Sequence, residues 1–125
     1  MGINLVMIER AYRGGVEQQY AHVLWLAHGL HRQQPLAVLL RGPATAYALA
    51  GIASEPVEVA GERWGAAPDY HAAIGRLHAD GARVYVSTTS LSDLGAIGPL
   101  LPGITPLSDD EIVKLIAECD RWWCL

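Results

Sequence analysis

Leu36-Ala37-Val38-Leu39-Leu40-Arg41-Gly42-Pro43 is the stretch of sequence that decides the fold. Its five consecutive apolar residues do not alternate with polar ones, which is typical of a parallel strand buried on both faces. Arg41-Gly42 predicts a turn after this strand. Pro43 suits the first position of a short helix, and Gly51 suits its end. A strand of this kind requires helices on both faces of its sheet.

The residues that precede this stretch predict a β-α-β unit. Ile3-Asn4-Leu5-Val6-Met7-Ile8 is another short apolar run and indicates the first buried strand. From Val16 to about Gln33, apolar residues recur at spacings of three and four, as they do on one face of an amphipathic helix. Pro35 ends this helix, because the residue before a proline disfavours helical geometry. The segment 9–15 is expected to be a loop.

The alternation of helix and strand continues to the C-terminus. The pattern predicts a helix over 69–80, a strand over 84–86, a short helix around Leu91 and Leu94, a small edge strand from Ile104, a helix opened by the capping box Ser108-Asp109-Asp110-Glu111, and a final strand over 122–125. Val57 and Val59 predict a short edge strand, followed by a loop to Gly65. We therefore expect a single α/β domain over residues 1–125, with about five mainly parallel strands and helices on both faces.

The composition limits the classes of function. Hydrophobic residues make up 51% of the 125 residues and charged residues only 18%. Globular proteins carry about 25% charged residues. A surface short of charge favours coverage by another subunit, although an alanine-rich monomer fits the same composition. The net charge of −4 and the lack of a basic run argue against nucleic-acid binding.

The compartment follows from the apolar runs and the cysteines. No apolar stretch reaches the roughly 18 residues of a membrane span, and the N-terminus does not resemble a signal peptide, so we expect a cytoplasmic protein without membrane contact. Cys119 and Cys124 are then expected to be reduced thiols. Cys119 is predicted to be an inert core residue of the last helix. Cys124 is the better candidate for a reactive thiol, because it lies next to the C-terminus with Arg121 as the nearest cation; the alternative is a small apolar strand residue.

Ligands of parallel sheets bind beyond the carboxyl ends of the strands, which here are the segments 9–15, 41–43 and 87–90. Ser87-Thr88-Thr89-Ser90 places four hydroxyls before a helix, where backbone N–H groups can hold an anion; the alternative is helix capping by Ser90. Arg13-Gly14-Gly15 suits an anion or small ligand, or a flexible turn. Arg41 is a further candidate binding residue at the same edge.

Two further features are weaker candidates. Trp64 lies in a glycine-flanked loop, where it either contacts a subunit or partner or folds back onto its own sheet edge. His28 and His31 are three residues apart on the long helix and are expected to be a solvent-facing or interface pair; no metal site is expected. The chain presents no paired carboxylates, no defensible Ser-His-Asp order and no metal cluster. An enzymatic activity is therefore not assigned, and no cofactor is expected.

Four stretches in the second half of the chain carry a resemblance to a known family. They are Leu77-His78-Ala79-Asp80-Gly81-Ala82-Arg83-Val84-Tyr85-Val86, Ser87-Thr88-Thr89-Ser90-Leu91-Ser92-Asp93-Leu94-Gly95, Leu100-Leu101-Pro102-Gly103-Ile104, and the closing Asp120-Arg121-Trp122-Trp123. Together they resemble the DsrE/DsrF/TusD-like sulfur-relay family. The first strand and the long helix fit the layout of that family as well, so the resemblance covers nearly the whole chain.

The resemblance implies a five-stranded, mostly parallel sheet, assembly into trimers or hexamers, and transfer of sulfur between proteins as a cysteine persulfide. Active members carry the sulfur on a cysteine just after the strand that here is 84–86, where this chain has Ser87. A serine oxygen cannot form a persulfide. The resemblance therefore implies a relay subunit or accessory that does not carry sulfur there, or one that uses Cys124. Its partners would be copies of itself, related subunits or a sulfur-carrier protein.

A different class of function also fits the sequence. Arg13-Gly14-Gly15 and the hydroxyl-rich segment 87–90 are expected at the same edge of the sheet. The alternative function is therefore a homo-oligomeric module that binds a small ligand or an anion.

Overall fold

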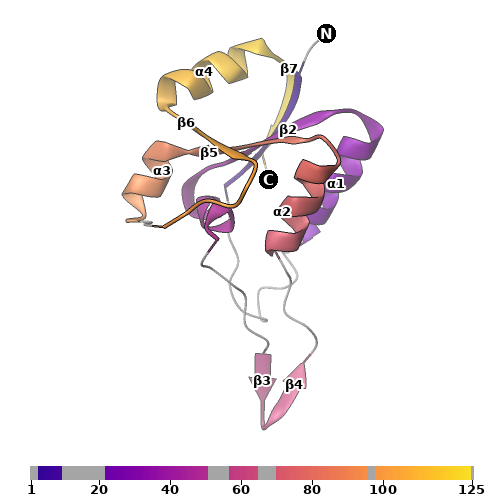
Figure 1. Cartoon of the computed structure of the whole chain (residues 1–125). Helices are drawn as coiled ribbons and strands as arrows, with labels where there is room; N and C mark the ends of the chain where they lie inside the picture. Colours follow the sequence, from indigo (N-terminus) through magenta and orange to yellow (C-terminus); the bar gives the residue numbers. More distant parts are fainter. Residues whose placement is uncertain (1–2, 10–21, 51–56, 65–69, 96–97, 125) are drawn as a thin grey trace.

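The chain folds into a parallel sheet flanked by helices, as Figure 1 shows for the computed structural model. The structure describes residues 3–9, 22–50, 57–64, 70–95 and 98–124. Its elements follow in the order β1 (Ile3–Ile8), α1 (His22–Gln33), β2 (Leu36–Leu40), the 3-10 helix η2 (Gly42–Ala48), β3 (Val57–Val59), β4 (Glu62–Trp64), α2 (Tyr70–Ala79), β5 (Arg83–Ser87), α3 (Thr88–Asp93), β6 (Ile104–Leu107), α4 (Asp109–Glu118) and β7 (Cys119–Cys124).

Five of the strands in the described ranges form the main sheet, in the order β6-β5-β2-β1-β7. Every neighbouring pair in this sheet is parallel. The predicted α/β class, with about five mainly parallel strands, is therefore confirmed. β2 is the central strand, which explains why its run of apolar residues shows no polar alternation: all five of its residues are buried.

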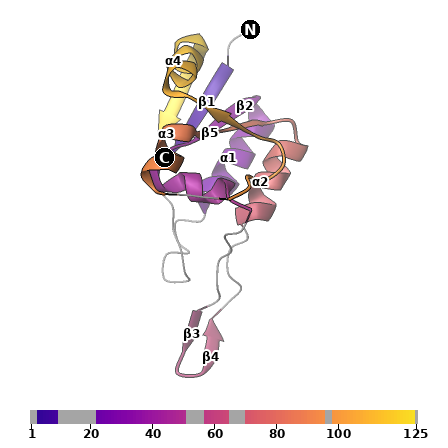
Figure 2. The ribbon, with the colours of Figure 1, turned by 60° about the vertical axis from the view of Figure 1, so that its left-hand side comes forward.

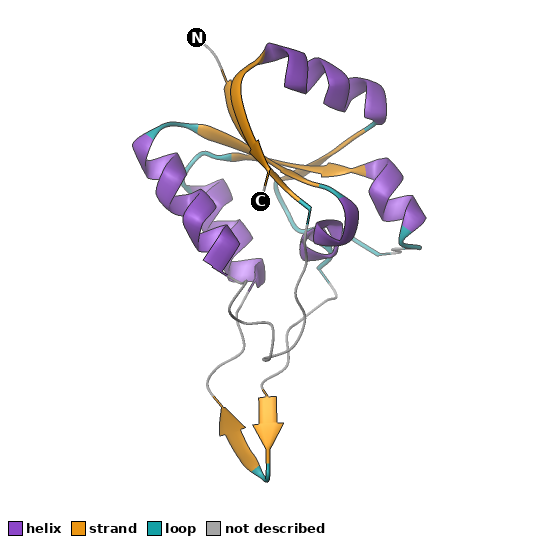
Figure 3. Ribbon diagram, turned by 180° about the vertical axis from the view of Figure 1, so that it is seen from behind, coloured by secondary structure: helices purple, strands orange, loops and turns teal. Residues whose placement is uncertain are grey.

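The two faces of the sheet are covered by different helices, as Figure 3 shows from behind. On one face, α1, α2 and η2 pack against alternate strand residues in a large apolar cluster that includes Val6, Ile8, Leu24, Val38, Leu40, Ile74, Leu77, Val84 and Val86. On the other face, α4 packs over a smaller cluster of Leu5, Met7, Ala37, Leu39, Leu107, Ile112 and Leu115. The strand residues divide between the clusters with a period of two, as the pleat of a strand requires.

The start of α4 follows the predicted capping box. The Ser108 hydroxyl accepts a hydrogen bond from the Glu111 N–H at 3.3 Å, and the Glu111 carboxylate accepts one from the Ser108 N–H at 3.1 Å. Two of the N–H groups that a helix start leaves without partners are thereby satisfied. The hydrogen bond from the Ser108 N–H is the main cause that holds the Glu111 pKa below its usual range.

The region around Trp64 differs from the prediction. Val57–Val59 does not join the edge of the main sheet, and Glu62–Trp64 is a strand where we expected a loop; the two form a separate antiparallel hairpin, seen apart from the sheet in Figures 1 and 3. Its two-residue turn, Ala60-Gly61, has positive φ at both positions (54° and 81°). Two-residue turns of this geometry usually carry Asn, Asp or Gly at the first position, so Ala60 gave no hairpin signal.

Two element boundaries also differ from the prediction. β7 begins at Cys119, directly after α4, rather than at Trp122, because the chain leaves the helix without a linker. α3 begins at Thr88, directly after β5, so that the hydroxyl-rich segment is the first turn of a helix. Within the ranges that the structure describes, no helix has the length and apolar character needed to cross a membrane.

Candidate functional site

A cavity lies at the carboxyl end of β5, where the sheet meets α3 and α4. It has a volume of about 370 Å³ and is lined by Arg41, Ser87, Thr89, Ser90, Asp93, Asp109, Ile112, Val113 and Ile116. Four of these nine residues belong to the predicted binding set: Arg41, Ser87, Thr89 and Ser90. The fold therefore brings together residues that are more than forty positions apart in the chain, as expected for the carboxyl ends of parallel strands. We call this cavity the β5 pocket.

Ser87 is the last residue of β5 and the N-cap of α3. Its hydroxyl accepts a hydrogen bond from the Ser90 N–H at 3.2 Å, so Ser87 caps the helix, and not Ser90 as the alternative interpretation predicted. Ser87 pairs in register with Leu107 and therefore faces the α4 side of the sheet. Only 2% of its surface is exposed. The side chain is thus a buried polar group at the base of the pocket.

Neighbouring hydroxyls tie α3 to other strand ends. The Ser90 hydroxyl accepts a hydrogen bond from the Gly42 N–H at 3.0 Å, which joins α3 to η2. The Thr88 hydroxyl donates to the Leu107 carbonyl at 3.1 Å, which joins α3 to β6. Thr88 does not line the β5 pocket, and its predicted binding role stays a prediction. Thr89, between them, is exposed at the rim.

The charge around the β5 pocket is mixed. The Arg41 guanidinium donates to the Glu9 carboxylate at 3.2 Å, so its charge is already partly balanced. The lining also contains the carboxylates of Asp93 and Asp109. Among the described residues the pocket therefore has more negative than positive charge, which disfavours an anion and favours a neutral polar or cationic ligand.

Among the residues that the structure describes, the β5 pocket does not present an activated nucleophile. The hydroxyl of Ser87 is hydrogen-bonded to a backbone N–H, and none of the described His, Asp or Glu side chains forms a hydrogen bond with it. A serine nucleophile needs an adjacent base to take its proton. The described part of the site is thus suited to binding rather than to covalent catalysis.

The two thiols occupy different environments. The Cys119 thiol donates to the Leu115 carbonyl at 2.9 Å, and burial, followed by the charges of Glu118 and Asp120, raises its pKa. The prediction of an unreactive Cys119 agrees with this environment, although the residue starts β7 instead of ending the helix. Cys124 is exposed, neither thiol is in a disulfide, and Cys124 pairs in register with Met7 on β1.

Cys124 does not belong to the β5 pocket. Strands β2 and β1 separate β5 from β7, so three strand spacings, about 14 Å, lie between the two strands. Ser87 and Cys124 are both near the carboxyl ends of their strands and face the α4 side, but their side chains cannot act on one small molecule. A role for Cys124 would be independent of Ser87.

The remaining predicted site residues are Arg13, Gly14, Gly15 and Trp64. Arg13, Gly14 and Gly15 lie outside the described residues. Trp64 is the last residue of β4, in a strand rather than a loop, and its proposed interface role stays a prediction. The pocket also contains α4 residues that the sequence did not indicate as site residues. They are Asp109 and the apolar Ile112, Val113 and Ile116, which form one wall of the pocket. The capping box placed Asp109 in the first helical turn, but no signal indicated that this turn lies beside the end of β5.

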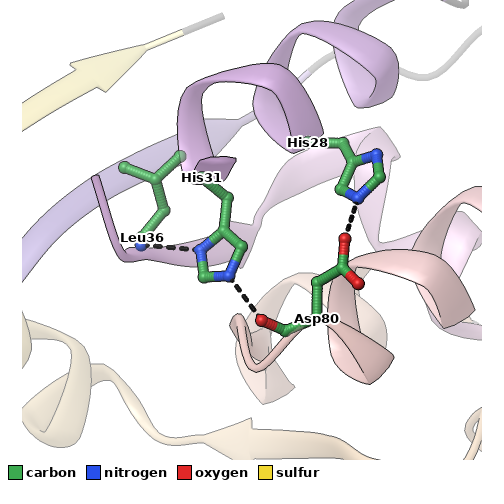
Figure 4. A network of polar contacts seen from close by, with 4 residues as sticks. All are labelled: His28, His31, Leu36 and Asp80. Carbon is green, nitrogen blue, oxygen red and sulfur yellow. Dashed lines mark hydrogen bonds and ion pairs between the residues drawn. The ribbon is translucent and has the colours of Figure 1, made fainter. Parts of the chain in front are cut away.

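His28 and His31 both contact Asp80, as Figure 4 shows. Asp80 precedes β5, so this contact lies at the end of the sheet opposite to the β5 pocket. The His28 Nε2 pairs with the Asp80 carboxylate, and the His31 Nε2 lies 2.8 Å from the Asp80 carbonyl. The Leu36 N–H donates to the His31 Nδ1 at 3.0 Å, so the Nε2 carries the proton and donates to Asp80. The histidines join α1, α2 and the start of β2, which is a structural role where we expected a solvent-facing or interface pair.

The hydrogen bond from His28 is the main cause that holds the Asp80 pKa below its ordinary value. No group of three or more His, Cys, Asp or Glu side chains within the described ranges is arranged to hold a metal ion.

Comparisons with known proteins give a structural likeness and no sequence match. No protein-family model matches the chain, and no curated protein matches it. Among solved structures, the crystal structure of the ychN protein from E. coli is similar, with a TM-score of 0.75 and 19% sequence identity over 100% of both chains. At this identity the likeness shows the fold alone: the chain has a DsrE-like α/β fold.

Proposed function

We propose that this protein acts in intracellular sulfur relay as a subunit or accessory that docks with sulfur-carrying proteins and holds no persulfide at the end of β5. One observation carries the proposal: Ser87 lies at the carboxyl end of β5, the position at which the family resemblance places the sulfur-carrying cysteine. The DsrE-like fold agrees with that correspondence.

The environment of Ser87 supports a non-carrying role. A persulfide requires a sulfur–sulfur bond, which an oxygen cannot supply. The Ser87 oxygen instead caps α3. Transfer would then occur between thiols of partner proteins, with this chain contributing a docking surface. Self-association, as a trimer or a hexamer, is part of the same proposal.

Persulfide loading tests the proposal. The purified protein is treated with polysulfide, alkylated and analysed by mass spectrometry, and in parallel its binding to a persulfidated sulfur-carrier protein is followed by native mass spectrometry. We expect binding without a stable persulfide on the wild-type chain. A stable persulfide on Cys124 would make the chain itself a carrier, and failure to bind any sulfur carrier would refute the docking role.

Two serine-to-cysteine variants test whether the end of β5 is a position that can receive sulfur. Ser87→Cys restores a thiol at the end of β5, and Ser92→Cys, on the exposed part of α3 outside the pocket lining, is the matched control. We expect persulfide transfer from the carrier protein to Ser87→Cys to exceed transfer to Ser92→Cys. Equal transfer to both variants would show that the end of β5 is not a sulfur position.

The β5 pocket supports a second candidate function, the binding of a small ligand. Its volume of about 370 Å³ falls within the range of small-molecule sites, and it combines hydroxyls with an apolar wall from α4. Its acidic balance favours an amine over the anion first considered. Thermal-shift assays with spermidine and with phosphate distinguish these ligand classes. A stabilisation by spermidine that is lost in Asp93→Asn/Asp109→Asn would support this function, and no shift with either compound would count against it.

A further inference from the structure

The last strand of the chain forms an open edge of the main sheet. β7 pairs with β1 on one side, and the sheet continues no further on its other side among the described residues. Figure 2 shows β7, in yellow, at the outside of the sheet beside β1. Residues 120–124 are all exposed, and Trp122 and Trp123 expose 55% and 38% of their surfaces. Two large apolar side chains thus lie on a strand that, among the described strands, pairs with β1 alone.

The opposite edge of the sheet carries features that block pairing. β6 has only four residues, and one of them is Pro106, which has no N–H to donate to a further strand. β7 has six residues and contains neither proline nor lysine, and its two charged residues, Asp120 and Arg121, are of opposite sign. Of the two edges, β7 is therefore the one whose sequence permits the addition of a strand.

The two indoles lie on opposite faces of the sheet. Trp122 pairs in register with Leu5, which packs under α4, whereas Trp123 pairs with Val6, which packs under α1 and α2. Parallel-paired residues share a face. A helix or loop resting on one face would cover only one indole. An added strand, flanked by its own side chains on both faces, would cover both and also satisfy the open backbone groups.

We propose that β7 pairs with β7 of a second copy of this chain, antiparallel and around a two-fold axis at Trp122, so that two five-stranded sheets become one continuous sheet. The contact specifies a surface for the hexameric form of the self-association proposed above, since a trimer contains no two-fold axis, and it does not depend on sulfur relay. A two-fold axis is the commonest symmetry of protein dimers, and it makes the same strand complementary to itself.

The side chains of β7 favour one register. A two-fold axis perpendicular to the sheet places residues of the same face opposite each other, so an axis at Arg121 would oppose two like charges. With the axis at Trp122, the Trp122 indoles of the two copies meet on the α4 face. Arg121 of each copy then lies opposite Trp123 of the other on the α1 face, where a guanidinium can rest on an indole ring. An axis at Trp123 would lose this pair.

The test combines oligomeric state with disulfide trapping, in a Cys119→Ser/Cys124→Ser background that removes the native thiols. In the proposed register the two Trp122 positions are directly opposite, with Cα atoms about 4.5–5.5 Å apart, which suits a disulfide. The two Trp123 positions are diagonal, about 7–8 Å apart, which does not. Under mild oxidation we expect Trp122→Cys to form a covalent dimer in high yield and the matched control Trp123→Cys to form little.

Analytical ultracentrifugation of the wild-type protein provides the second measurement. We expect a dimer or a multiple of it, and a shift toward monomer in Arg121→Glu/Trp123→Glu with an unchanged circular dichroism spectrum. Because both residues are exposed in the single chain, the variant should fold. A wild-type protein that stays monomeric at high micromolar concentration would overturn the proposal. So would cross-linking of Trp123→Cys at least as efficient as that of Trp122→Cys, or association unaffected by the double substitution.

Discussion

Ser87 has a structural role as a helix cap and also lies at the strand end on which the functional proposal depends. It ends β5, caps α3 and forms the buried base of the β5 pocket. The cap explains why a serine is stable at this position without any chemistry: its hydroxyl satisfies one N–H at the helix start. The functional proposal therefore depends on the correspondence between position 87 and the sulfur-carrying cysteine of the family that the sequence resembles, and the Ser87→Cys variant is its direct test.

The two thiols should react at very different rates. The Cys119 pKa is raised, mainly by burial, which lowers the thiolate fraction at a given pH, and the thiol is also hydrogen-bonded to Leu115. We expect iodoacetamide at neutral pH to alkylate Cys124 at least about tenfold faster than Cys119, since the thiolate is the reacting form. Single-thiol variants, Cys119→Ser and Cys124→Ser, allow each rate to be measured by mass spectrometry. A faster reaction of Cys119 would contradict its assignment as an inert residue.

The lowered pKa of Asp80 predicts that the stability of the fold depends on pH in the acid range. Its pKa is lowered from 3.8, mainly by the hydrogen bond from His28. A carboxyl whose pKa is lower in the folded state contributes stability above its unfolded value, and this contribution is lost as the pH falls through the folded value. We expect wild type to exceed Asp80→Asn in its urea midpoint at neutral pH, and the difference to shrink below pH 3.8.

An exposed carboxylate outside this network provides the control for Asp80. Glu62→Gln, in the β3–β4 hairpin, should show a smaller difference at neutral pH. A difference for Asp80→Asn that persists unchanged into strong acid would show that the charge of Asp80 is not the cause.

At the scale of elements, α4 is the described helix that covers the second face of the sheet, so its stability matters to that layer. Its capping box is complete, and Ser108→Ala removes the hydroxyl that accepts from the Glu111 N–H. We expect a loss of about 1 kcal/mol in the free energy of unfolding. Ser92→Ala, at an exposed position of α3, should change stability by less than about 0.5 kcal/mol. Urea denaturation measures both, and equal losses would argue that the box contributes nothing.

The elements that could be predicted carry a clear signal in the sequence, and the elements that were missed do not. Strands β1 and β2 were predicted because burial on both faces requires an uninterrupted apolar run, and helix α4 was predicted because a capping box marks its start. The alternation of Val57 and Val59 predicted β3, but its hairpin with β4 was missed because Ala60 adopts a turn geometry that its residue type rarely takes. Cys119 was placed in the helix because its apolar character fits both the last turn of α4 and the first residue of β7.

At the scale of the whole molecule, association through β7 would couple stability to protein concentration. A partner that binds only the folded chain stabilises it by mass action. We expect the Tm of the wild-type protein to rise with protein concentration and that of Arg121→Glu/Trp123→Glu to stay constant. Differential scanning calorimetry over a hundredfold concentration range measures this dependence. A Tm of the wild type that is independent of concentration would contradict association coupled to folding.

The sequence by itself determined the class of fold, the burial of Leu36–Leu40 on both faces and the strand ends that form the β5 pocket, because these depend on burial and on rules that hold for every parallel sheet. It could not determine which loop lies beside which helix. The acidic balance of the pocket, the meeting of His28 and His31 at Asp80, and the exposure of Trp122 and Trp123 were decided by tertiary structure alone. These features depend on the relative placement of segments far apart in the chain, and local periodicity carries no record of that placement.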